Sequence, residues 1–213
     1  MDIAVKIFQI IFYITASVVA VLTFVKAKNG LLNSVNTEYQ KKVMERLALL
    51  SDELWEEFDF SSENHWSKDD TLNEVLEKIH KYALENKHAI LSKEKGFHGV
   101  PLPKKHIEMI AMVERLKSDP FIPEIIRKKI VTLLDDRLNS TLEAYITVIE
   151  QYQEDLTKGK RWSNFDENKS FIHNDIVSIM SKNGLGITEL QGAVQEIRKE
   201  IQRYYESFNP IGN

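Results

Sequence analysis

An apolar run near the N terminus constrains this chain more than any other feature. Residues 7–25 contain no charged side chain, and twelve of these positions are Ile, Leu, Val or Phe. At a helical rise of about 1.5 Å per residue, the segment from Ile3 to Val25 spans roughly 35 Å, which exceeds a hydrocarbon core of about 30 Å. The run therefore predicts a helix that crosses a membrane and stays attached to the protein.

Two other interpretations of this run stay open. The segment "VKA" at 25–27 has small residues at the spacing of a signal-peptidase site, so the run could belong to a secretory signal that is removed. It could also be a buried helix of a soluble core. The length of the run and the weakly basic residues before it favour an anchor. We predict an N-terminal transmembrane anchor over residues 1–30 and a second domain over residues 31–213.

The distribution of Lys and Arg around the run predicts its orientation. Lys6 precedes the run. Basic residues are more numerous after it: Lys26, Lys28, Lys41, Lys42 and Arg46. Because basic flanks stay on the cytoplasmic side, we predict a single-pass protein of the inner (plasma) membrane, with its N terminus outside and its C-terminal domain in the cytoplasm.

One face of the predicted span carries small and polar residues three or four positions apart. These are Gln9, Tyr13, Ala16, Ser17, Ala20 and Thr23. Small side chains let a second membrane helix approach closely, and polar ones can share hydrogen bonds with it. The face therefore predicts packing against another membrane helix, although such residues also scatter through many spans by chance.

Composition narrows the class of the second domain. The chain is 43% hydrophobic and 28% charged, which is typical of a folded globular protein. It contains no cysteine, which excludes disulfides, thiol nucleophiles and cysteine-ligated metals. A net charge of -4 gives no general attraction for nucleic acid, so no nucleic-acid partner is predicted.

Apolar residues recur at helical spacing through the rest of the chain, and no alternation typical of strands persists. We predict an all-α fold in which an elongated antiparallel bundle of about five to six helices follows the anchor. After a break near residues 28–36, the expected helices cover roughly 39–58, 71–95, 104–118, 123–152, 170–182 and 188–208. The helix from Pro123 is long enough to form the spine of the bundle or a coiled-coil seam.

Local signals mark several of these boundaries. The sequences "TLNE" at 71–74 and "TELQ" at 188–191 match the capping box, in which a threonine hydroxyl and a glutamate or glutamine serve the first amides of a helix. The stretch "GFHGVPLPKK" at 96–105 contains two glycines and two prolines, which predicts a loop and a possible boundary within the domain.

A doubled Glu-x-x-His pattern is the sharpest chemical coincidence. Glu77 with His80 and Glu85 with His88 have the spacing at which helical metal proteins place a carboxylate and an imidazole on one face. The two copies are eight residues apart on one predicted helix, or about 12 Å along its axis, so they cannot share an ion. Each would need carboxylates from another helix, such as Asp135, Asp136 or Glu143. Solvated chance pairs are the competing interpretation.

The remaining candidates are weaker. The basic segments "RKK" at 127–129 and "KGKR" at 158–161, the latter beside Trp162, could contact lipid headgroups or a phosphate, or be solvated helix surfaces. His98, His106 and His173 accompany no nucleophile, phosphate loop or zinc-protease pattern. No catalytic residue, cofactor or small-molecule substrate is predicted, and an enzyme is not favoured.

We therefore expect a membrane-tethered helical scaffold or adaptor whose partners are the lipid bilayer and either another protein or further copies of this chain. Two alternatives stay open. The first is a membrane-acting effector, of toxin or host-defence type, that oligomerises through its transmembrane helix. The second is a metal-dependent helical enzyme.

Overall fold

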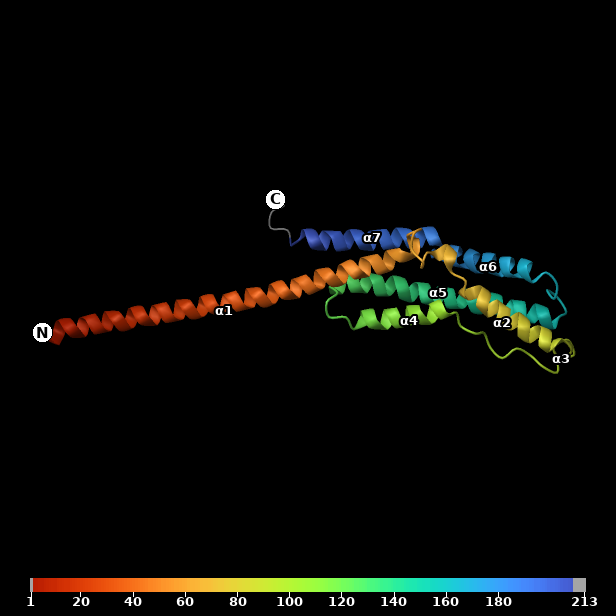
Figure 1. Cartoon of the computed structure of the whole chain (residues 1–213), viewed down its shortest axis with the longest axis horizontal. Coiled ribbons are helices and arrows are strands. Elements are labelled where there is room, and N and C mark those ends of the chain that lie inside the picture. The colour runs from red at the N-terminus through yellow and green to blue at the C-terminus, as the bar shows by residue number, and fades with distance from the viewer. Residues whose placement is uncertain (1, 209–213) are drawn as a thin grey trace. The chain divides into compact units, whose positions relative to one another are not determined.

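The computed structural model describes residues 2–208, and the fold of these residues is all-α, as predicted: 80% of them are helical and none lies in a strand. The helices are α1 (Asp2–Trp55), α2 (Thr71–Glu85), α3 (Lys87–Leu91), α4 (Lys104–Lys117), α5 (Glu124–Thr157), α6 (Phe165–Lys182) and α7 (Ile187–Glu206), with short 3-10 turns at Glu56–Phe58 and Trp66–Lys68 (Figure 1). The chain divides into two compact units, one ending at Arg46 and the other beginning at Leu47.

The predicted break near residues 28–36 is wrong, because α1 continues through this segment without interruption. A single glycine inside a helix costs only about 1 kcal/mol relative to alanine, so Gly30 does not end the helix. The hydroxyl of Thr37 donates to the carbonyl oxygen of Asn33 at 2.8 Å, which keeps this polar group bonded within its own helix.

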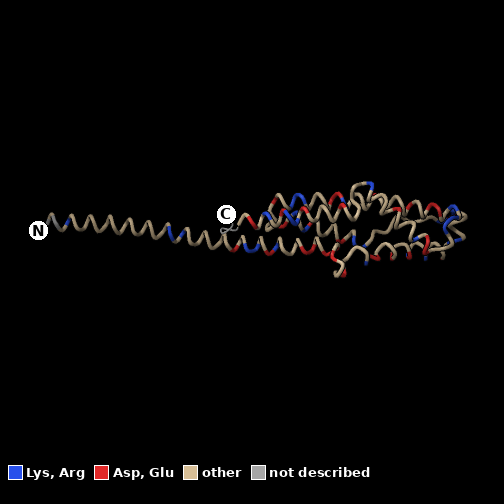
Figure 2. Tube along the Cα trace, turned by 90° about the horizontal axis from the view of Figure 1, so that it is seen from above, with Lys and Arg blue, Asp and Glu red and all other residues tan. Residues whose placement is uncertain are grey.

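The apolar stretch of α1 is exposed along its whole length. Its most apolar eighteen-residue stretch contains no buried residue, so the structure does not make this run the core helix of a soluble domain. Figure 2 shows the segment without charge between Lys6 and Lys26. Within residues 2–208, α1 is the one helix whose length and composition would let it cross a membrane.

The second unit is organised around α5, which packs against α3, α4, α6 and α7. The 34 residues of α5 give it a length of about 51 Å. α4 and α7 lie along its first half, whereas α2 and α6 lie along its second half (Figure 1). The apolar face predicted for this helix is buried from Ile126 to Tyr152, with Leu133 and Leu142 half-buried.

The other helices bury the faces that their spacing predicts. Leu47, Leu50 and Leu54 at the end of α1 are buried. So are Val75, Leu76, Ile79 and Ala83 of α2 and Leu190, Val194, Ile197 and Ile201 of α7. The loop predicted at 96–105 lies between α3 and α4, and α4 begins at Lys104 as expected.

The helix expected to run from residue 71 to residue 95 is interrupted, which corrects the prediction. α2 ends at Glu85, and Asn86 separates it from the short α3. The side-chain amide of Asn86 donates to the carbonyl oxygen of Tyr82 at 2.9 Å, so it competes with the backbone amides that would continue the helix. α6 also differs, since it begins at Phe165, five residues earlier than predicted.

Both predicted capping boxes are wrong in mechanism, although helices begin close to each. The carboxylate of Asp69 accepts from the amide of Thr71 at 3.1 Å and from its hydroxyl at 2.7 Å, so this hydroxyl is not free to cap α2. In the second case α7 begins at Ile187 after Gly186, which places Thr188 inside the first turn instead of before it.

Candidate functional site

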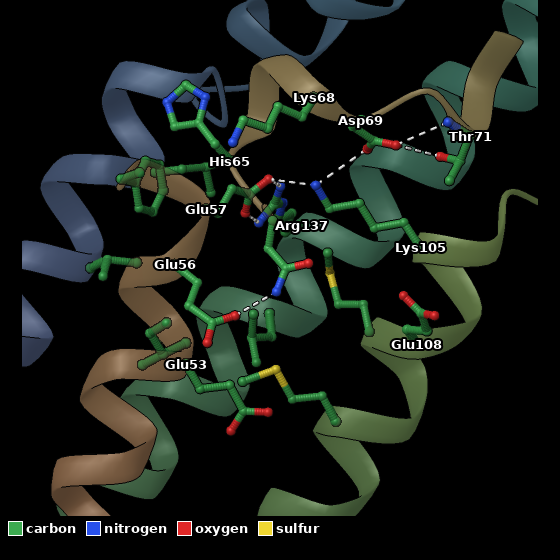
Figure 3. Close-up of a pocket in the computed structure, with 18 of the residues that line it drawn as sticks. Glu53, Glu56, Glu57, His65, Lys68, Asp69, Thr71, Lys105, Glu108 and Arg137 are labelled. Atoms are coloured by element: carbon green, nitrogen blue, oxygen red, sulfur yellow. Dashed lines mark hydrogen bonds and ion pairs between the residues drawn. The ribbon is translucent and has the colours of Figure 1, made fainter. Parts of the chain in front are cut away.

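One cavity of the second unit is lined by an ion-pair network. We call it the charged cavity. Its volume is about 410 Å³, and its walls come from the end of α1, residues 56–71, α4, α5 and α7. Seven carboxylate side chains and four Lys or Arg side chains line it, so acidic side chains are in excess. In Figure 3, Arg137 and Lys105 both reach Glu57, and methionine side chains lie beside them.

Arg137 and Glu57 form the centre of this network. Nη1 of Arg137 donates to Oε2 of Glu57 at 2.5 Å, and Nη2 donates to Oε1 at 2.6 Å. The two side chains are only 16% and 15% exposed. A bidentate pair of this kind fixes the relative position of both groups, and here it ties α5 to the turn that follows α1.

Lys105 of α4 extends the network to a third segment. Its ammonium lies 3.1 Å from Glu57 Oε1 and 3.2 Å from Asp69 Oδ2 (Figure 3). Asp69 in turn accepts hydrogen bonds from Thr71, which is the first residue of α2. Four segments that are distant in the sequence are thus joined by one row of charged hydrogen bonds.

The ionisation of these carboxylates follows from their neighbours. Burial alone would raise the pKa of Glu57, but the hydrogen bonds and charge of Arg137, with those of Lys105, lower it to about 2. Burial likewise acts to raise the pKa of Asp69, and Thr71 and Lys105 outweigh it, so that this pKa is lowered. Both groups are therefore ionised near neutral pH and hold no proton to donate.

This chemistry suits binding better than catalysis. A general acid or base works best with a pKa near the operating pH. The pKa values of Glu57 and Asp69 are lowered, which moves them farther from neutral pH. The ammonium of Lys105 and the guanidinium of Arg137 are engaged by these carboxylates. The excess of negative charge can attract a cationic group such as a lysine or arginine side chain.

The residues of the doubled Glu-x-x-His pattern are not brought together. Glu77 and His80 lie on α2, but Glu85 is the last residue of that helix and His88 lies on α3. Glu77, Glu85 and His88 are exposed, and Asp135 pairs with Lys117 at 3.7 Å. Residues 2–208 contain no group of three or more His, Asp or Glu side chains placed to hold a metal. Metal binding at these positions stays a prediction.

His80 has a structural environment of its own. Its ring stacks on Phe165 of α6, with the ring centroids 4.1 Å apart and the planes at 15°. Its Nδ1 atom is buried, with no hydrogen-bond partner among the described residues. Burial lowers the pKa of His80, which favours the neutral ring in this contact.

The small and polar face of the predicted span lies on α1. The side chains of Gln9, Tyr13, Ala16, Ser17, Ala20 and Thr23 are all exposed. Thr15 lies on another face, and its hydroxyl donates to the carbonyl oxygen of Ile11 at 2.8 Å, so this hydroxyl is bonded within its own helix. Packing of a second helix against the small and polar face stays a prediction.

The basic segment beside Trp162 is held tightly in the loop between α5 and α6. The indole Nε1 of Trp162 donates to the carbonyl oxygen of Leu156 at 2.9 Å, and the ammonium of Lys87 lies 5.0 Å from the centre of its ring. Arg161 donates from Nε to Asp155 at 2.8 Å. These contacts fix Arg161 and Trp162, whereas Lys158 and Lys160 are exposed, as expected of a solvated surface. Contact of this segment with lipid headgroups or a phosphate stays a prediction.

The charged cavity itself was not predicted. Glu57 and Arg137 are 80 residues apart, and neither belongs to a recognisable motif. Comparisons with protein-family models, with curated proteins and with solved structures found no match to this chain. The function proposed below is therefore supported by the residues of this chain alone.

Proposed function

We propose that this protein is a membrane-tethered helical module that binds a protein partner, or further copies of itself, at the cytoplasmic membrane surface. The observation that carries the proposal is the exposed apolar stretch of α1. Leaving a large apolar side chain in water instead of burying it costs about 1.5–3 kcal/mol, so the twelve Ile, Leu, Val and Phe side chains of this stretch represent on the order of 20 kcal/mol. A lipid bilayer would remove that cost.

The second unit supports a role in binding. A tether to the membrane raises the effective concentration of one protein for another at the same surface. The charged cavity supplies more carboxylates than Lys and Arg side chains, and the pKa of Glu57 and that of Asp69 among them are lowered. We propose that the partner presents lysine or arginine side chains to this cavity, and that the ion pairs of Glu57 and Lys105 keep its walls in place.

Membrane attachment and orientation are tested together by cysteine labelling, because the chain has no cysteine of its own. A Ser92→Cys variant places one thiol on an exposed position of the second unit. We expect the protein to stay in the membrane fraction after alkaline carbonate washing. A membrane-impermeant maleimide should label the variant only after the cells are opened. Release by carbonate, or labelling of intact cells, would contradict the proposal.

The choice between a partner and further copies of the chain is tested by disulfide crosslinking within the span. Ala16→Cys and Ala20→Cys lie on the small and polar face, whereas Val18→Cys lies about 200° around the helix and serves as the control. Crosslinked dimers at 16 and 20 but not at 18 would indicate self-association. A different protein that stays bound in stoichiometric amount after mild detergent extraction would indicate a protein partner. A monomer with no crosslinked dimer and no bound protein would contradict both self-association and partner binding.

A further inference from the structure

A second cavity lies between α5 and α6, away from the charged cavity. We call it the tyrosine cavity, and its walls include Thr147, Gln151, Tyr152, Arg161, Asp175 and Lys182. Its volume is about 260 Å³, slightly less than the range of about 300–1,000 Å³ that is typical of sites for drug-sized ligands. Three apolar side chains, Val148, Ile172 and Ile179, line it as well, so its polar groups lie beside apolar surface and the cavity suits a small occupant.

Tyr152 lines this cavity, and its hydroxyl is unusual. Tyr152 is only 2% exposed, and its hydroxyl oxygen is buried with no hydrogen-bond partner among the described residues. Tyr145, two turns earlier on α5, is 3% exposed, but its hydroxyl donates to the carbonyl oxygen of Pro101 at 3.0 Å. A buried polar atom without a partner costs about 1–3 kcal/mol, so such atoms usually have a ligand or a water molecule beside them.

Arg161 reaches the same cavity from a loop whose backbone is strained. Its φ angle is 57°, a left-handed conformation that residues other than glycine seldom adopt. Asn168, which is buried, donates to its carbonyl oxygen at 2.8 Å, and Asp155, also buried, accepts from its Nε at 2.8 Å. Strained residues held by several buried contacts are frequent at ligand sites.

The contacts of Arg161 leave part of its guanidinium available. The hydrogen bond to Asp155 uses Nε, and no described residue accepts from either terminal amino group. Lys182 at the rim has no ion pair with any described residue, so it adds a second cation. Two carboxylates accompany these cations: that of Asp155, which is bonded to Arg161, and that of Asp175 in the cavity wall. Burial raises the pKa of Tyr152 to about 12, so its hydroxyl keeps its proton near neutral pH and can donate.

From this arrangement we infer that the tyrosine cavity binds a small anion through one phosphate group. The terminal amino groups of Arg161 and the ammonium of Lys182 donate to its oxygens, and so does the hydroxyl of Tyr152. Arginine suits this role because its planar donors match the oxygens of a phosphate. The phosphate belongs either to a soluble ion or metabolite or to a lipid headgroup.

Titration of the full chain in mild detergent with inorganic phosphate tests the inference, at constant ionic strength maintained with chloride. We expect saturable heat release by calorimetry and a rise in melting temperature with phosphate concentration. Lys182→Gln changes an exposed side chain and Tyr152→Phe removes only an oxygen, so both variants should fold. Each should weaken phosphate binding at least threefold, and Arg161→Gln should weaken it at least tenfold.

Tyr145→Phe is the matched control, because it removes a hydroxyl from the same helix outside this cavity. It should leave the phosphate affinity unchanged. A short-chain phosphatidylglycerol below its micellar concentration tests the lipid source in parallel. Binding of this lipid but not of phosphate, with the same loss in the variants, would assign the anion to a headgroup. Binding of neither probe, or equal affinity in Lys182→Gln, Tyr152→Phe and the unmodified chain, would overturn the inference.

Discussion

The charged cavity and the tyrosine cavity treat buried polar groups in opposite ways. In the charged cavity, both oxygens of Glu57 and both terminal amino groups of Arg137 are bonded to each other. In the tyrosine cavity, the buried hydroxyl of Tyr152 has no partner among the described residues. A closed network stabilises the fold that contains it, whereas an open group adds a cost that a ligand can remove. Arg137 of the closed network and Tyr152 both lie on α5.

Breaking the closed network should have the largest effect. Arg137→Met removes the main partner of a carboxylate that is only 15% exposed, and loss of one partner from a buried ion pair typically costs 3–5 kcal/mol. Because some solvent reaches both groups, we expect a loss of about 3 kcal/mol in the free energy of unfolding. Urea denaturation followed by tryptophan fluorescence would measure it, since Trp55, Trp66 and Trp162 all lie in the second unit.

The double variant Glu57→Met with Arg137→Met is the control for this experiment. It removes both charges and leaves side chains of similar length, so most of the stability should return. Equal instability of the single and double variants would mean that packing, and not the unpaired carboxylate, accounts for the loss.

Acid should open the same network without any substitution. The pKa of Glu57 is about 2 in the folded protein and about 4.5 when unfolded, so its contribution is present above pH 4.5 and is lost as the pH falls toward 2. A shift of this size corresponds to roughly 3 kcal/mol. The stability difference between the unmodified chain and Glu57→Gln should therefore shrink by more than half between pH 6 and pH 3. A constant difference would contradict the assignment.

Removing the hydroxyl of Tyr145 or of Tyr152 should change the free energy of unfolding by a smaller amount. Tyr145→Phe removes a hydrogen bond and leaves the carbonyl oxygen of Pro101 without it, which should cost about 1 kcal/mol. Thermal or urea denaturation of this variant beside the unmodified chain measures the effect. No loss of stability would show that the Tyr145 hydroxyl is as weakly bonded as that of Tyr152.

Tyr152→Phe should have the smallest effect of all in buffer without phosphate. It removes an oxygen that has no partner, so stability should change by less than about 0.5 kcal/mol or rise slightly. A loss as large as that of Tyr145→Phe would show that the hydroxyl makes a hydrogen bond in the protein, which would remove the difference between the two cavities.

The sequence predicted the fold well where periodicity is long. The face from Ile126 to Tyr152 and the face of α7 were predicted because apolar residues recur at three and four positions over many turns. Short signals were less reliable. Gly30 suggested a break that α1 does not have, and Asn86 ends α2 where no break was expected. The first outcome depends on the small cost of one glycine inside a helix, and the second on the side-chain hydrogen bond of Asn86 to Tyr82.

The cavities could not be predicted for a different reason. Tyr152 was correctly predicted as part of an apolar face, but the missing partner of its hydroxyl is a property of the packed structure. Glu57 and Arg137 carry no local signal, because their pairing depends on how the turn after α1 meets α5. The Glu-x-x-His pattern is the opposite case, a clear local signal that the described structure does not turn into a metal site. Spacing alone cannot supply the further ligands that a metal requires.

The central position of α5 also sets an order of events during synthesis. Its last residue, Thr157, is translated 132 residues after Val25, and at about 5–20 residues per second this interval is on the order of ten seconds. The apolar faces of α2 and α4 are complete during this time, but the helix against which they pack is not. The N-terminal apolar run of the nascent chain is therefore complete well before its second unit can close.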